Sequence, residues 1–102
     1  MLSRLIIILL LPLLSYSQNW NIATQFPYTG VHHPITFSYD NYGFVITGSN
    51  TDNTFRYDKN TDSWTQLANF PGGDRGYAYG VAKDDKAYMG FGSDPSGNFP
   101  ND

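Results

Sequence analysis

Hydrophobic and polar residues alternate along the middle of the chain in short runs separated by turn-forming residues. The runs cover residues 34–40, 42–48, 53–58 and 63–68, and Asn, Asp, Gly and Ser are common between them. Alternation with a period of two is typical of half-buried β-strands. No segment after residue 17 has the apolar period of 3.6 that marks an amphipathic helix. The pattern predicts four consecutive strands joined by tight turns.

Two phrases recur 44 residues apart without insertions or deletions. "WNIATQFP" at residues 20–27 is matched by "WTQLANFP" at 64–71, and "YGFVITGS" at 42–49 is matched by "KAYMGFGS" at 86–93. Four short strands per repeat of roughly 40–50 residues are typical of a blade of a β-propeller. The sequence therefore predicts an all-β repeat protein made of four-stranded antiparallel blades.

The first 17 residues have a different pattern. One positive charge at Arg4 precedes the ten-residue apolar run 5–14, and small residues follow at Ser15 and Ser17. This order is typical of a secretory signal peptide, with cleavage after Ser17. The run is too short to span a bilayer. We expect a signal-peptide helix, a secreted or periplasmic protein and no stable membrane anchor; the alternatives are a short buried helix or an uncleaved anchor.

The repeated unit resembles a kelch repeat. In that family one strand ends in a glycine pair, and a later Tyr-Asp is followed by a turn with Thr and then by a Trp. Tyr57-Asp58, Thr61 and Trp64 match the second half of this pattern, whereas Ser49 and Ser93 replace the second glycine of each pair. The resemblance implies kelch-type or galactose-oxidase-like blades. The structural positions that it marks are Trp20, Gly48, Tyr57, Asp58, Trp64 and Gly92.

The expected strands make fewer than two blades, whereas a closed propeller needs at least four. Residues 18–30 are interpreted as an outer strand, at 19–26, and a linker; residues 31–71 as a complete blade; and residues 72–102 as a partial second blade. The resemblance implies that the first strand closes the ring of a longer propeller, so the remaining blades of that propeller are expected partners. The alternative is a small two-sheet domain that assembles with copies of itself.

Composition narrows the classes of partner. Residues 18–102 contain five Lys or Arg, nine Asp and no Glu, which gives a net charge of −4. An acidic chain without basic runs argues against nucleic acid and against anionic membrane surfaces. The chain has no cysteine, so no disulfide can stabilise it.

Candidate binding residues lie in the loops of one face. In an antiparallel blade, the inter-blade linkers and the loops after Gly48 and Gly92 lie at the same end, where propellers usually bind ligands. The candidate binding residues lie at this end, whereas the opposite end has turn-forming aspartates such as Asp58 and Asp62. An arginine here can clamp a carboxylate or pair with its neighbouring Asp. The candidates are His32, His33, Asn50, Asp74 and Arg75.

No catalytic residue, metal site or cofactor is assigned from the sequence. Adjacent residues of an extended chain point in opposite directions, so His32 and His33 are poorly placed to share one ion. The spacing of the aspartates does not match a calcium-binding EF-hand loop. The leading hypothesis is a secreted propeller that acts as a binding scaffold for a protein or a glycan. The alternative is part of a sugar-modifying enzyme, of the galactose-oxidase or sialic-acid mutarotase type, that is inactive as a fragment.

Overall fold

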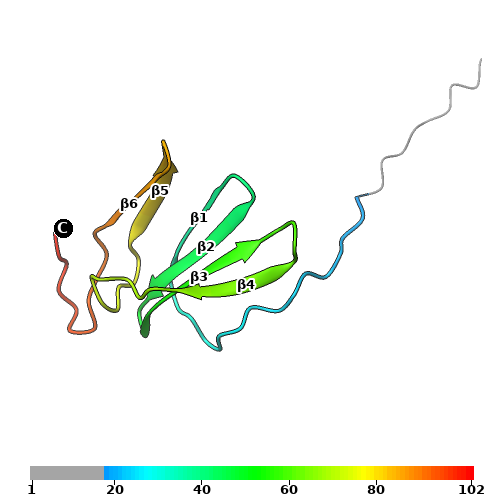
Figure 1. Ribbon diagram of the computed structural model, residues 1–102. Coiled ribbons are helices and arrows are strands. Elements are labelled where there is room, and N and C mark those ends of the chain that lie inside the picture. The colour runs from blue at the N-terminus through cyan, green and yellow to red at the C-terminus, as the bar shows by residue number, and fades with distance from the viewer. Residues whose placement is uncertain (1–17) are drawn as a thin grey trace, which may run out of the picture.

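The computed structural model describes residues 18–102, which form two antiparallel β-sheets (Figure 1). The expected signal peptide lies outside the described residues. The first sheet has the order β1-β2-β3-β4, and the second consists of one hairpin. The prediction of an all-β fold with a four-stranded antiparallel sheet is confirmed. The strands are β1 (Ile35–Tyr39), β2 (Tyr42–Gly48), β3 (Thr51–Asp58), β4 (Ser63–Leu67), β5 (Tyr79–Lys83) and β6 (Lys86–Gly90).

The period of 44 residues is visible in the backbone as well as in the sequence. β5 and β6 begin 44 residues after β1 and β2. Left-handed backbone conformations recur at the same distance, in the pairs His33 and Tyr77, Asp40 and Asp84, and Thr47 and Phe91. A hydrogen bond recurs too: the amide of Ser49 donates to the carbonyl of His32 at 2.9 Å, and the amide of Ser93 donates to that of Gly76 at 2.8 Å. The second sheet is therefore a partial copy of the first.

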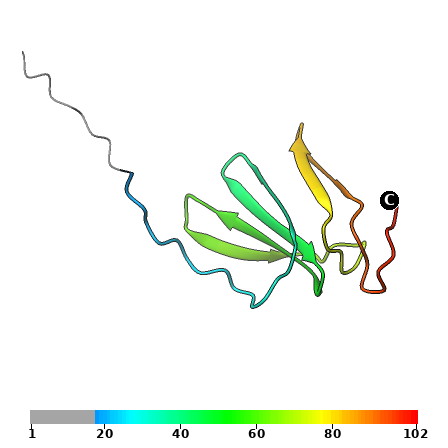
Figure 2. The same ribbon diagram turned by 180° about the vertical axis from the view of Figure 1, so that it is seen from behind.

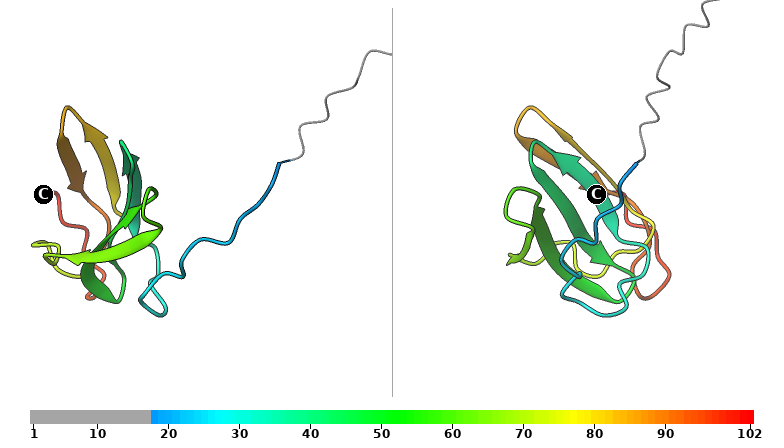
Figure 3. Two further views of the ribbon diagram at one scale, coloured as in Figure 1. Left: turned by 45° about the vertical axis from the view of Figure 1, so that its right-hand side comes forward. Right: turned by 90° about the vertical axis from the view of Figure 1, so that its right-hand side faces the viewer.

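The two sheets pack face to face, with large side chains opposing small ones. Directly paired residues of antiparallel strands share a face. The large-residue face of the first sheet carries Ile35, Phe37, Phe44 and Ile46. It is covered by the small-residue face of the second sheet, which carries Gly80, Ala82, Ala87 and Met89. Figures 2 and 3 show the hairpin β5–β6 beside β1, from behind and from the side.

Buried apolar residues lie on both sides of the first sheet. Ile35 and Ile46 are 1% and 4% exposed on the large-residue face. Phe55 lies on the opposite face and is covered by the preceding chain, because the rings of Phe26 and Tyr28 lie 5.1 and 6.0 Å from its own. Burial of such side chains is the main favourable contribution to folding.

The predicted repeat positions have structural roles in and around the first sheet. A Cβ at Gly48 would lie only 2.9 Å from the carbonyl oxygen of His32, so the close approach of that linker requires glycine. Tyr57 and Trp64 are cross-strand partners whose rings lie 5.1 Å apart. The carboxylate of Asp58 accepts the amide of Asn60 at 2.8 Å and stabilises the β3–β4 turn. Gly92 has a φ of +75°, which also favours glycine.

The outer strand expected at residues 19–26 is not formed. Residues 18–34 contain no strand, because no other described segment runs alongside them to form a β-ladder. Trp20 is 90% exposed, although its sequence counterpart Trp64 lies in β4. The match between these tryptophans in sequence is therefore not a match in local structure. Within residues 18–102, we find no helix of the length and hydrophobicity that crossing a membrane requires.

Candidate functional site

Two linkers and the loops that follow the glycines gather at one end of the two sheets, as the sequence predicted (Figure 1). The first linker is residues 27–34, before β1, and the second is residues 68–78, between β4 and β5. The loop after β2 contacts the first linker, through the bond between Ser49 and His32. The second linker contacts both the loop after β6 and the first linker, because Gly76 bonds to Ser93 and Tyr77 bonds to His33. The structure therefore brings the candidate residues from separate linkers to the same end of the molecule.

An exposed pair of stacked rings lies at this end. The rings of His33 and Tyr77 are 3.9 Å apart and inclined by only 23°. Both residues have left-handed backbones, with φ of +50° and +58°, and the amide of Tyr77 donates to the carbonyl of His33 at 3.3 Å. His33 is exposed, and Tyr77 is 64% exposed. Tyr77 was not predicted from the sequence; its position 44 residues after His33 is the signal that would have found it.

Asn50 fixes the first linker beside this pair. Its Oδ1 accepts the amide of His32 at 3.3 Å, and its Nδ2 donates to the carbonyl of Gly30 at 2.6 Å. The Asn50 side chain therefore has a structural role. The imidazole of His32 is exposed, and its centroid lies 6.3 Å from that of His33. Among residues 18–102, no group of three or more potential metal-ligating side chains comes together.

Arg75 is not available to an external ligand in this structure, contrary to the possibility that it clamps one. It is 3% exposed, and its Nη1 donates to Oδ1 of Asp102 and to the carbonyl of Phe91, at 2.8 and 2.9 Å. Its Nη2 lies 3.3 Å from Oδ2 of Asp102 and from the carbonyl of Gly72. The guanidinium thus joins the second linker, the end of β6 and the last residue.

The partner of Arg75 is Asp102 and not the adjacent Asp74, so the expected pairing of neighbours is wrong. Neighbouring side chains diverge in extended chain, and here the arginine points into the protein. The hydrogen bond from Arg75 lowers the pKa of Asp102, and the same bond raises the pKa of Arg75. Asp74 is half-buried beside Arg75 and takes no part in this pair.

Thr47 is a buried polar residue that the sequence analysis missed. Its side chain is fully buried at the end of β2, and its hydroxyl accepts the amide of Arg75 at 2.9 Å. The carbonyls of Thr51 and Gly73 lie 3.0 and 2.8 Å from the same oxygen. One hydroxyl therefore connects the β2–β3 turn to the second linker. A threonine within an apolar strand gives no sequence signal for such a role.

A compact turn closes the loop after β6. The carboxylate of Asp94 accepts the amides of Ser96 and Asn98, each at 2.9 Å, and the side-chain amide of Asn98 at 3.1 Å. These bonds from Asn98 and Ser96 lower the pKa of Asp94. Gly97 has a φ of +79°. The arrangement is an Asx-type turn, in which the aspartate is occupied by the local backbone.

An apolar cleft of about 210 Å³ lies between the two sheets, away from the predicted candidates. Phe37, Phe44 and Leu67 line one wall, and Ala82 and Ala87 line the other. The hydroxyl of Tyr39 donates to the carboxylate of Asp85 across its mouth, which raises the pKa of Tyr39. The cleft is a gap between packed sheets and presents few polar groups to a ligand.

Comparisons of the chain with protein-family models, with curated proteins and with solved structures found no match in any of the three. The resemblance to kelch repeats therefore depends on the residues of this chain alone.

Proposed function

We propose that the chain is part of a secreted or periplasmic kelch-type β-propeller that serves as a binding scaffold for a glycan or a protein. The four-stranded sheet, its partial copy after 44 residues and the positions of Gly48, Tyr57 and Trp64 support the architecture. The pattern of residues 1–17 supports export. Loops gathered at one end of a rigid sheet are the usual place for binding residues.

The exposed stack of His33 and Tyr77 is the observation that carries the binding role. The two rings, whose centroids are 3.9 Å apart, present an exposed aromatic surface, and the polar imidazole of His32 lies beside them. Aromatic surfaces with a few polar groups around them are typical of ligand sites. Tyrosine also has a hydroxyl that can bond to a polar ligand while its ring packs against an apolar one. This combination favours a sugar ring as the ligand.

The test is a glycan array followed by titration of any glycan that binds. Tyr77→Asn removes the exposed ring, and asparagine tolerates the left-handed backbone at this position. We expect this variant to lose at least about tenfold in affinity, a change of about 1.4 kcal/mol. Trp20→Ser is the matched control, because it removes another exposed aromatic ring from a segment outside the loop end.

The outcomes separate the possible roles. Glycan binding that Tyr77→Asn leaves unchanged places the site elsewhere, and failure to bind any glycan or protein contradicts the scaffold proposal. Chemical change of a bound sugar, followed by nuclear magnetic resonance, would favour the enzyme alternative instead.

A further inference from the structure

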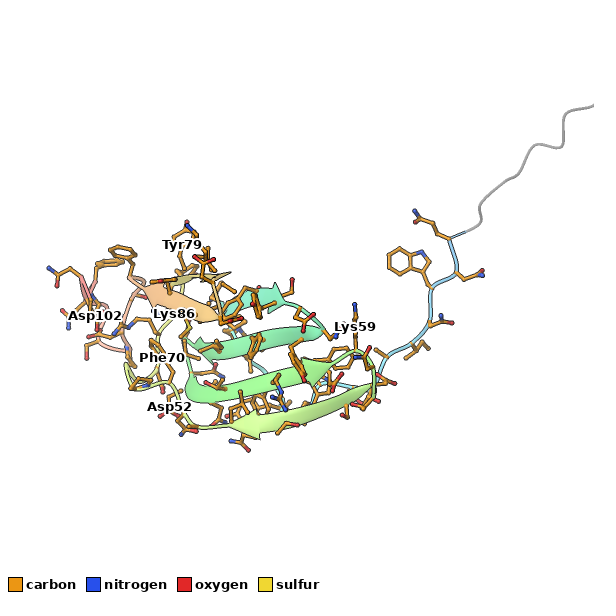
Figure 4. The ribbon with its side chains drawn as sticks, turned by 45° about the horizontal axis from the view of Figure 1, so that its top comes forward. Asp52, Lys59, Phe70, Tyr79, Lys86 and Asp102 are labelled. Carbon is orange, nitrogen blue, oxygen red and sulfur yellow. The ribbon has the colours of Figure 1, made fainter. Side chains whose placement is uncertain are left out.

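A contiguous apolar surface lies on the outer side of the second sheet. Tyr79, Val81 and Tyr88 are 77%, 60% and 56% exposed, and Val81 and Tyr88 are direct cross-strand partners. Figure 4 shows Tyr79 on the side of the hairpin that is turned away from the first sheet. Large apolar side chains gathered on an exposed face of a soluble protein usually mark an interaction surface.

This surface repeats one that the fold already buries. Tyr79, Val81 and Tyr88 lie 44 residues after Ile35, Phe37 and Phe44, which form the large-residue face of the first sheet. That face is covered by the small-residue face of the second sheet, where Gly80 lies against Ile35 and Phe37. The outer side of the hairpin is therefore the large-residue face of the second sheet, and no sheet covers it within residues 18–102.

The complementary surface is also present in the chain. The small-residue face of the first sheet carries Thr36, Ser38, Gly43 and Val45, which precede Gly80, Ala82, Ala87 and Met89 by 44 residues. Thr36 and Ser38 are exposed. Phe26 and Tyr28 also lie on this side of the first sheet, but they pack on Phe55 of β3, which is next to β2 in the sheet.

We propose that the chain associates with a second copy of itself head to tail. The large-residue face of the second sheet in one copy packs on the small-residue face of the first sheet in the next copy. This contact continues the interface that already joins the two sheets within one chain. The two surfaces are different, so the contact is heterologous, and each added copy leaves one surface of each kind uncovered.

Charge at the tips of the hairpins is complementary in this arrangement. Within the chain, the hydroxyl of Tyr39 in β1 bonds to Asp85 in the β5–β6 turn. The residue 44 positions after Tyr39 is Lys83, and the turn 44 positions before Asp84 and Asp85 is Asp40-Asn41. The repeated contact thus places Lys83 of one copy against Asn41 of the next, so that its ammonium lies close to the carboxylate of the adjacent Asp40. Salt weakens an exposed pair of this kind, so we expect association to weaken as salt concentration rises.

Analytical ultracentrifugation of the full chain, expressed with residues 1–17 and purified as the host processes it, tests the proposal. We expect the average mass of the wild type to rise with protein concentration. Val81→Arg and Ser38→Arg each block one surface, so each variant alone remains a monomer. An equal mixture of the two forms a dimer and nothing larger, because one unblocked surface of each kind remains. Thr65→Arg adds the same charge to an exposed position of β4 and leaves association unchanged.

Two results would overturn the proposal: a wild type that remains a monomer, or a Ser38→Arg variant that still associates through two identical faces. Circular dichroism identifies any arginine variant that fails to fold. A cysteine pair gives an independent test, because the chain has no cysteine of its own. The contact of Ile35 with Gly80 corresponds to Tyr79 against Thr36 of the next copy. A mixture of Tyr79→Cys and Thr36→Cys chains should form a covalent dimer that neither forms alone, and no such dimer means that this contact does not occur.

Discussion

At the scale of single residues, Thr47 connects the loops at one end of the sheets, a role that its position in an apolar strand does not suggest. A β-branched residue is costly in a left-handed conformation, yet Thr47 has a φ of +51°. The contacts of its hydroxyl offset this cost, since the hydroxyl accepts the amide of Arg75 and lies beside the carbonyls of Thr51 and Gly73. The strained backbone therefore serves to connect two loops.

Thr47→Val keeps the shape of this side chain and removes its hydroxyl. We expect it to lower the free energy of unfolding by about 1–3 kcal/mol, because buried backbone groups lose their partner. Urea denaturation measures the change. Thr65→Val, at an exposed position of β4, is the control and should stay within about 0.5 kcal/mol of the wild type. Equal effects of the two substitutions would show that the Thr47 hydroxyl has no special role.

The β3–β4 turn contains a carboxylate whose pKa the fold lowers. The hydroxyl of Tyr57 and the amide of Thr24 donate to Oδ1 of Asp62, at 2.6 and 2.8 Å. The bond from Tyr57 is the main cause of the lowered pKa of Asp62, and it also raises the pKa of Tyr57. A lowered carboxyl pKa contributes stability above the unfolded pKa of about 4, and that stability is lost as the pH falls through the folded value.

Tyr57→Phe removes the main cause of this shift. We expect the carboxyl pKa of Asp62 to rise toward its ordinary value, and the acid-induced loss of stability below about pH 4 to become smaller. Carboxyl titration by nuclear magnetic resonance follows the first effect. Tyr28→Phe removes a hydroxyl that makes no bond to Asp62 and should leave its titration unchanged. An unshifted Asp62 pKa in Tyr57→Phe would mean that the hydrogen bond does not form in solution.

At the scale of strands and sheets, the packing depends on Gly80. A Cβ at this position would overlap Cγ2 of Ile35, which is 1% exposed and cannot move into solvent. We expect Gly80→Ala to lower the free energy of unfolding by about 1–3 kcal/mol, the usual cost of overpacking a core. Gly43→Ala is the matched control, because its Cβ would lie 4.0 Å from the nearest atom, the Cβ of Tyr57. Thermal unfolding should separate the two variants.

Most strands were predictable because their signals are local. The run 42–48 coincides with β2, and the runs 34–40 and 63–68 differ from β1 and β4 by one residue at one or both ends. β3 begins two residues before the predicted start at Asn53, because Thr51 pairs with Gly48 across the turn. The strand expected at 19–26 is not formed because a strand needs a paired neighbour, and the last blade, with which the resemblance implied that it pairs, is not among the described residues.

The candidate site was predictable in its location but less so in its contacts. The alternation of strand directions placed the linkers and glycine loops at one end. The partners within that end depend on side-chain directions that a linear pattern does not contain. Arg75 bonds to Asp102, which is 27 residues away, and Tyr77 stacks on His33 across two linkers. Long-range contacts of this kind follow from the packing of the two sheets.

At the scale of the whole molecule, the repeat is exact in spacing but incomplete in structure. The hairpin β5–β6 copies β1–β2, whereas the described chain contains no copy of β3 and β4 after β6. The N-terminal segment before the first linker shows the same asymmetry, because Trp20 is exposed while Trp64 packs against Phe26 with ring centroids 4.9 Å apart. The N-terminal segment contacts the β3–β4 turn through Thr24 and extends away from the sheets before it (Figure 3).

The two tryptophans make this asymmetry measurable. The indole Nε1 of Trp64 donates to the carbonyl of Thr24 at 3.0 Å, so Trp64→Phe keeps an aromatic ring but loses one of the bonds that attach the N-terminal segment to the sheet. We expect it to lower the free energy of unfolding by about 1 kcal/mol, whereas Trp20→Phe should cause no measurable change. The remaining tryptophan reports on each variant by fluorescence: Trp64 should shift on unfolding in Trp20→Phe, and Trp20 should emit as a solvated indole throughout in Trp64→Phe. Equal shifts in the two variants would mean that residues 19–26 form a packed strand after all, as the repeat in the sequence had predicted.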